Sequence, residues 1–77
     1  MVPQPGDVLD VGHAASVQFA GKSRLVFCVI SISRRPTYDG WAWLTGYSLN
    51  RSGIAKERRE IFVCLAGLRL YEPSIEV

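Results

Sequence analysis

The chain has little of the chemistry on which metal sites and many enzymes depend. Among its 77 residues there are two cysteines, one histidine and one methionine. Cys28, Cys64 and His13 supply three ligands where a closed zinc site takes four, so the sequence predicts no metal ion. Both cysteines lie within apolar stretches, which predicts two buried free thiols; a disulfide joining two strands is the alternative.

Long hydrophobic runs are also missing. The longest aliphatic and aromatic run, at 25–30, is far shorter than the roughly 20 residues of a membrane-spanning helix. The first seven residues contain no basic region followed by an apolar one, so no signal peptide is predicted. We therefore expect a cytoplasmic protein that has no membrane partner.

The charge balance favours neither sign strongly. Nine lysines and arginines face seven aspartates and glutamates, and a net charge of +2 does not by itself indicate a nucleic-acid partner. Hydrophobic residues make up 48% of the chain, which is typical of a globular protein. We expect one domain at 7–73, a flexible N-terminal tail at 1–6 and a C-terminal tail at 74–77.

Strand signals dominate the remaining pattern. Alternating apolar residues predict short strands at 7–11 and 15–19, and runs rich in β-branched and aromatic residues predict strands at 24–33 and 41–49. Turn signals separate these strands at 21–23, 37–40 and 50–53. The segment 54–65 favours a strand, although its helix-forming residues leave a helix as the alternative. A tight corner at 66–67 precedes a short last strand at 68–71.

The chain resembles SH3-like barrels. The resemblance lies in Gly6-Asp7-Val8, in Gly40-Trp41-Ala42-Trp43, and in 63–68, which looks like the corner that leads into the last strand of such barrels. It implies an all-β fold, a small five- to six-stranded SH3-like barrel with a one-turn 3-10 corner before the last strand. Fold resemblance alone implies no function.

No residues indicate catalysis. The sequence has no recognisable nucleophile motif and no glycine-rich phosphate loop, and Asp7 and Asp10 are not spaced as an acid–base pair. Plasmid-borne type II dihydrofolate reductases resemble the chain in length and barrel type. Their Val-Gln-Ile-Tyr active-site stretch would fall near 60–63, where this chain has Glu-Ile-Phe-Val. We therefore expect a protein that is not an enzyme and binds no cofactor.

Aromatic and arginine residues form the candidate binding face. Side chains alternate between the two faces of a strand, so Trp41, Trp43 and Tyr47 share one face of the strand 41–49. We expect this face to point outward, since Ala42 and Gly46 suit a small core better; the alternative places the tryptophans in the core. The predicted site consists of Tyr38, Trp41, Trp43, Tyr47, Arg34, Arg35, Arg58 and Arg59.

Arginines beside aromatic rings fit two kinds of partner. Together they grip single-stranded nucleic acid by stacking and phosphate contact, and they also form the centres of protein interfaces. The sequence favours a nucleic-acid-linked accessory or regulatory factor. A protein-interaction module or a small subunit of a larger assembly, including self-association, is the alternative. Pairing of the arginines with Glu57 and Glu60 would leave them as ordinary surface charges.

Overall fold

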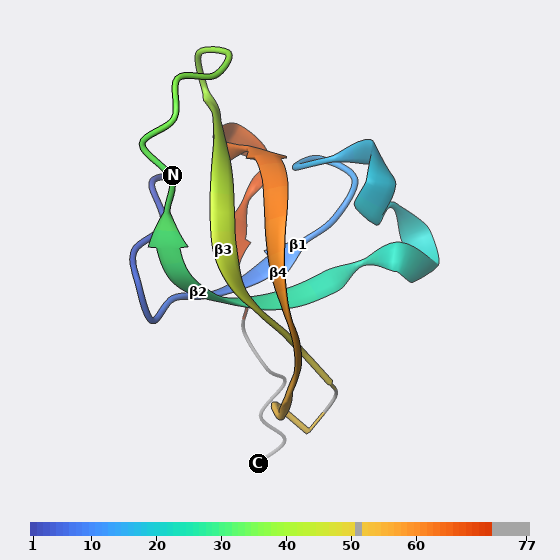
Figure 1. Cartoon of the computed structure of the whole chain (residues 1–77). Coiled ribbons are helices and arrows are strands. Elements are labelled where there is room, and N and C mark those ends of the chain that lie inside the picture. Colours follow the sequence, from blue (N-terminus) through green and yellow to red (C-terminus); the bar gives the residue numbers. More distant parts are fainter. Residues whose placement is uncertain (51, 72–77) are drawn as a thin grey trace.

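The computed structural model describes residues 1–50 and 52–71. Five strands form within these ranges (Figure 1): β1 (Val8–Val11), β2 (Leu25–Ile32), β3 (Trp41–Leu49), β4 (Ala55–Cys64) and β5 (Arg69–Leu70). Three one-turn 3-10 helices connect them: η1 (Val17–Phe19), η2 (Gly21–Ser23) and η3 (Leu65–Gly67). No helix in these ranges has the length and apolar character needed to cross a membrane. The expected tail at 74–77 lies outside the described residues.

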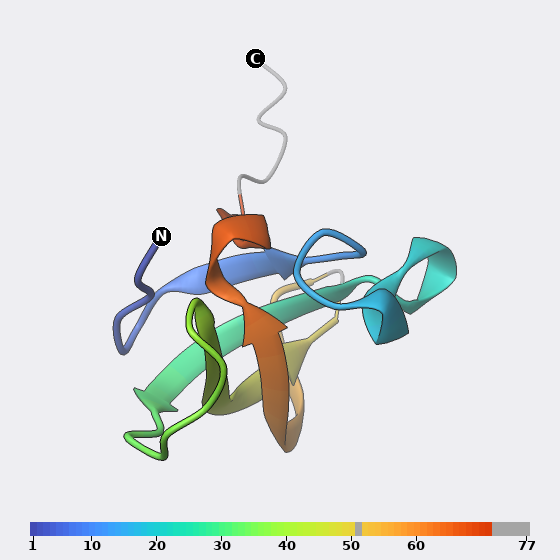
Figure 2. The ribbon, with the colours of Figure 1, turned by 90° about the horizontal axis from the view of Figure 1, so that it is seen from above.

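All five strands belong to one antiparallel sheet in the order β4-β3-β2-β1-β5. This confirms the all-β class, and η3 is the expected one-turn 3-10 corner before the last strand. Among the described residues, the outer strands β4 and β5 are not paired with each other, so the sheet is open. Figure 2 shows how strongly it coils: β2 spans the molecule, and β4 crosses it at a steep angle.

The long second strand bends where its register shifts. The pairing of β2 with β3 slips between Val29 and Ser31, which leaves Ile30 as an extra residue. Before the slip, β2 also pairs with β1, from Cys28 to Leu25. One continuous strand therefore serves both halves of the sheet, and the two halves enclose the core between them.

The segment 54–65 forms β4, so the helix alternative is wrong. A tight turn at the preceding hairpin, where the Asn50 N–H donates to the Ile54 carbonyl at 2.9 Å, sends the chain straight back along β3. Ile61 and Val63 then become buried on the inner face, while Phe62 lies on the outer face. Pairing with β3 outweighs the helix propensity of the charged residues before them.

The prediction of a strand at 15–19 is wrong, because this segment completes a turn and then forms η1. The N–H groups of Ala15 and Ser16 both donate to the Gly12 carbonyl, at 3.0 and 3.1 Å, which turns the chain out of β1. Val17 is 76% exposed and Phe19 is buried, so the two alternating residues do not build one buried face. β1 already has β2 and β5 as neighbours, so this segment cannot pair with β1 as a further strand.

Residues 3–7 fold against the end of β2. Pro3 is buried, and the Gly6 N–H donates to the Val29 carbonyl at 2.8 Å. A turn closed by the Asp7 N–H on the Gln4 carbonyl, at 3.0 Å, holds this segment in place. The expected flexibility of this tail stays a prediction.

The core lies on the inner face of the coiled sheet. Its centre is the contact between the Phe27 side chain and Gly46 on the neighbouring strand. A Cβ atom at Gly46 would lie 2.8 and 2.9 Å from Phe27 ring atoms and would overlap the Cys28 carbonyl oxygen. The core comprises Leu9, Val11, Ala15, Phe19, Leu25, Phe27, Val29, Leu44, Ile61, Val63 and Leu68.

We expect Gly46→Ala to lower the free energy of unfolding by about 2–3 kcal/mol, because the added methyl group meets backbone and a packed ring. Urea denaturation followed by tryptophan fluorescence measures this loss. Gly12→Ala is the matched control, since its Cβ would meet only Arg24 side-chain atoms, at an ordinary 3.7 Å. Equal effects of the two substitutions would contradict the packing argument.

Candidate aromatic binding site

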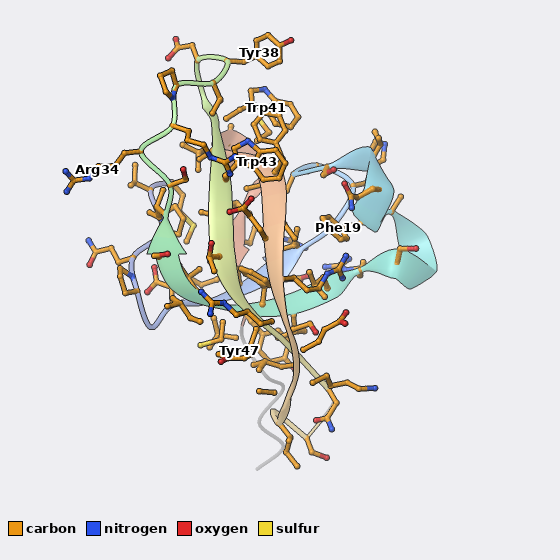
Figure 3. All side chains as sticks on the ribbon, viewed as in Figure 1. Phe19, Arg34, Tyr38, Trp41, Trp43 and Tyr47 are labelled. Atoms are coloured by element: carbon orange, nitrogen blue, oxygen red, sulfur yellow. The ribbon has the colours of Figure 1, made fainter. Side chains whose placement is uncertain are left out.

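Three aromatic rings stack on the outer face of β3 and β4, and Figure 3 labels the two indoles among them, Trp41 and Trp43. The Phe62 ring lies between two indoles, with its centroid 5.1 Å from that of Trp41 and 5.0 Å from that of Trp43. The interplanar angles are 22° and 40°, so the first pair is stacked and the second is tilted. We call Trp41, Trp43 and Phe62 the aromatic stack. Contacts of this kind between rings add stability beyond the area that they bury.

Strand alternation places the stack outside the core. Ala42, Leu44, Gly46 and Ser48 are buried on the inner face of β3, so the odd-numbered residues between them face outward. The register then sets Trp43 directly opposite Phe62. Both indoles are half-buried, so neither is a core residue and neither is fully open to solvent.

One arginine covers the Trp43 end of the stack. The Arg35 guanidinium lies 5.0 Å from the centroid of the Trp43 ring, a cation–π contact. It also donates to Oε1 of Glu60 at 2.8 Å and to the hydroxyl of Ser33 at 3.1 Å. These contacts hold the guanidinium against the ring while more than half of the Arg35 side chain stays exposed.

Tyr38 stands in the loop beyond the other end of the stack and is 78% exposed. A tight turn presents it: the Trp41 N–H donates to the Tyr38 carbonyl at 3.0 Å, and the Thr37 hydroxyl donates to the same oxygen at 3.0 Å. Gly40 adopts a positive φ of 81° in this turn. The Leu65 N–H then donates to the Gly40 carbonyl at 2.8 Å, which ties the loop to η3.

Four of the predicted site residues therefore lie together: Tyr38, Trp41, Trp43 and Arg35. The other aromatic residue, Tyr47, shares their face but lies four residues beyond Trp43, roughly 13 Å along the strand. Figure 3 shows Tyr47 far from Tyr38.

The remaining three predicted arginines lie apart from the stack. Arg58 is opposite Tyr47 in the register, at the distant end of the face. Arg34 extends away from the indoles (Figure 3). Arg59 belongs to the inner-face positions, with its guanidinium 5.5 Å from the centroid of the Phe19 ring. The prediction that these arginines flank one aromatic face is therefore wrong for Arg59, because neighbouring residues of a strand point to opposite faces.

Phe62 is the site residue that the sequence analysis missed. The hairpin pattern indicates such a residue, because a strand that returns along β3 must place every second side chain on the outer face, beside the tryptophans. The register that sets Phe62 opposite Trp43 depends on a shift between Ser48 and Leu49, where two residues of β4 oppose one of β3. Such a bulge has no clear sequence signature here.

Most of the described arginines are paired with carboxylates. Arg35 pairs with Glu60, and Arg59 lies 3.8 Å from Glu57. Arg24 and Arg69 converge on Asp10, the latter at 3.5 Å. Within residues 1–50 and 52–71, the arginines without an ion pair are Arg34 and Arg58. The arginines therefore do not form one continuous basic patch.

The Asp10 cluster joins three parts of the chain: β1, the start of β2, and β5. A hydrogen bond from Arg24 holds the pKa of Asp10 below its ordinary value. Partial burial opposes this shift, while the charges of Arg24 and Arg69 add to it. The same hydrogen bond raises the pKa of Arg24.

The two cysteines are free and half-buried. The expected free thiols are confirmed, and the disulfide alternative is wrong. The expected burial is wrong, because Cys28 lies on the outer face opposite Tyr47 and Cys64 lies on the same face opposite Trp41. Across the described part of the chain, no three His, Cys, Asp or Glu side chains gather as metal ligands.

Comparison of the chain with protein-family models, with curated proteins and with solved structures gives no match. Any proposal on function must therefore rest on the geometry of the aromatic site and on the distribution of charge around it.

The lowered pKa of Asp10 predicts a pH-dependent contribution to stability. Because its folded pKa lies below the unfolded value of about 3.9, the ionised carboxylate stabilises the fold above that pH, and this contribution is lost as the pH falls through the folded pKa. We expect Asp10→Asn to lower the Tm by about 2–5 °C at pH 7, and by progressively less toward pH 2.

Thermal unfolding between pH 2 and pH 7 measures this difference. Asp39→Asn is the control, because it removes the same charge from an exposed residue that forms no ion pair within the described residues. A Tm difference for Asp10→Asn that stayed constant over this pH range would contradict the assignment.

Proposed function

We propose that the chain is a non-enzymatic binding module of SH3-like barrel type, and that its aromatic stack binds a segment of another protein. The observation that carries the proposal is the group of half-buried rings on the solvent face, between an exposed tyrosine and an arginine held by an ion pair. Aromatic and arginine side chains of this kind dominate the binding energy of protein interfaces.

The strand arrangement supports the fold part of the proposal. The order β4-β3-β2-β1-β5, a bent second strand and a 3-10 turn between the last two strands are what an SH3-like barrel has. In such a barrel the two outer strands approach each other, and η3 connects those strands here. A barrel of this kind suits a short chain, because coiling the sheet encloses a core that a flat sheet of this size cannot.

The charges favour a protein partner over a nucleic acid. A strand of DNA or RNA needs unpaired positive groups along its phosphates. Around the stack, Arg35 is already paired with Glu60, while Arg34 and Arg58 lie away from the rings. The site thus combines apolar rings with a neutralised rim, which fits a peptide with a large apolar side chain flanked by polar groups.

We expect peptides selected from a random library on the intact chain to depend on the stack. Trp43→Ala and Tyr38→Ala should each weaken their binding at least tenfold, because truncating a ring at the centre of an interface removes about 1.4 kcal/mol or more. Fluorescence anisotropy with labelled peptides measures the loss.

Tyr47→Ala is the matched control, since it removes a ring from the same face outside the proposed site. Equal losses for Tyr47→Ala and Trp43→Ala would contradict the placement of the site. Binding of single-stranded DNA or RNA that falls steeply with salt, together with no selected peptide, would instead favour the nucleic-acid function.

A further inference from the structure

β4 lies at the edge of the open sheet and pairs with β3 alone. In the described part of the chain, one backbone hydrogen bond leaves its other edge, from the Cys64 N–H to the Ala15 carbonyl at 2.8 Å. The edge from 55 to 63 therefore presents backbone groups with no partner from the described residues. Such an edge is a template on which another strand can pair.

The hydrogen bonds show which residues of β4 face this free edge. The Cys64 N–H points away from β3, and in an antiparallel ladder every second residue does the same. The Trp43 carbonyl accepts from Ser33 on the β2 side, at 2.9 Å, so its paired residue Phe62 also directs its backbone groups to the free edge. By the same alternation, Glu60 and Arg58 present their N–H and C=O groups there.

The side chains of these two residues are charged with opposite sign on the outer face. Two copies that pair antiparallel about a twofold axis at Arg59 place Arg58 of each copy directly opposite Glu60 of the other. An axis at Arg58 or at Glu60 would instead set two like charges against each other on this outer face, whereas the axis at Arg59 sets its like-charge contact on the inner face. Charges on an edge strand commonly prevent pairing, but here the order of Arg58 and Glu60 makes this register attractive on the outer face.

The single chain leaves these charges ready for such contacts. Arg58 makes no ion pair with any described residue, and Glu60 is almost half exposed beside Arg35. The two Arg59 side chains lie opposite each other at the axis, on the inner face. Each is held by contacts within its own copy: its guanidinium lies 5.5 Å from the centroid of the Phe19 ring, and its Nε lies 3.8 Å from Oε1 of Glu57. The second copy would complete an ion-pair chain from Arg35 through Glu60 to its own Arg58.

We propose that the chain forms a symmetric dimer through the free edges of β4, with Arg58 and Glu60 paired across the twofold axis. The backbone groups of these two residues form hydrogen-bonded pairs with their counterparts, which joins the two sheets into one. A short chain with a small core gains stability from such an association. The dimer does not depend on the proposed function, because it forms through backbone and charged groups of β4 and requires no ligand on the aromatic stack.

Sedimentation equilibrium of the full chain, from micromolar to millimolar concentration, tests the dimer. We expect Arg58→Glu and Glu60→Arg each to raise its dissociation constant roughly tenfold or more, because each sets like charges opposite each other twice. The double variant should restore the dissociation constant to within about threefold, since it reverses both signs. Arg34→Glu makes the same charge change away from the edge and should have no effect.

Amide hydrogen exchange supplies a second measurement that needs no variant. The N–H groups of Arg58 and Glu60 should exchange more slowly at high protein concentration than at low, whereas those of Glu57 and Arg59, which face β3, should exchange equally. A chain that stays monomeric at millimolar concentration would overturn the proposal. So would a double variant as weak as the single ones, or concentration-independent exchange at Arg58 and Glu60.

Discussion

The contact between the Phe27 ring and Gly46 determines which side of β3 faces the core. Gly46 has no side chain, and the ring of the neighbouring strand occupies the space that one would fill. The other inner residues of β3, Ala42, Leu44 and Ser48, are also small or of medium size. A core enclosed by so short a sheet has no room for two indoles, so the strand that provides these small residues must carry its tryptophans outside.

Large apolar rings on a solvent face need cover, and the hairpin supplies it. Phe62 comes to lie between the two indoles because β4 returns along β3 in a register that sets it opposite Trp43. Arg35 then covers one side of Trp43 and is itself fixed by Glu60. The rings are thereby held in one arrangement but keep exposed surface, and this preorganisation is what a binding site requires.

Composition and alternation were enough to predict the all-β class, the strands at 24–33 and 41–49 and the outward face of the tryptophans, and the resemblance to SH3-like barrels implied the one-turn corner. They were not enough for features that depend on contacts between distant residues. The strand at 54–65 is favoured by the sequence, but only its pairing with β3 excludes the helix alternative. The turn after Gly12, which replaces the strand expected at 15–19, is closed by the N–H groups of Ala15 and Ser16 and is held to β4 by the hydrogen bond from the Cys64 N–H. The separation of Arg58 from Arg59 follows from strand alternation, because adjacent residues of a strand point to opposite faces, but only the register places Arg58 opposite Tyr47.

The arginines show how a small domain uses charge to hold its parts together. Asp10 pairs with the arginine directly before β2 and with one from β5, so a single carboxylate ties the first strand to the entry of the second and to the last. Glu60 joins the loop after β2 to β4 through Arg35 in the same way. Together with the pair of Arg59 and Glu57, these pairs engage four of the six described arginines, whose charge a phosphate backbone would need, and the surfaces that we propose for recognition are therefore the rings of the stack and the edge of β4. Both are surfaces that a protein chain can satisfy, the first with an apolar side chain and the second with backbone hydrogen bonds.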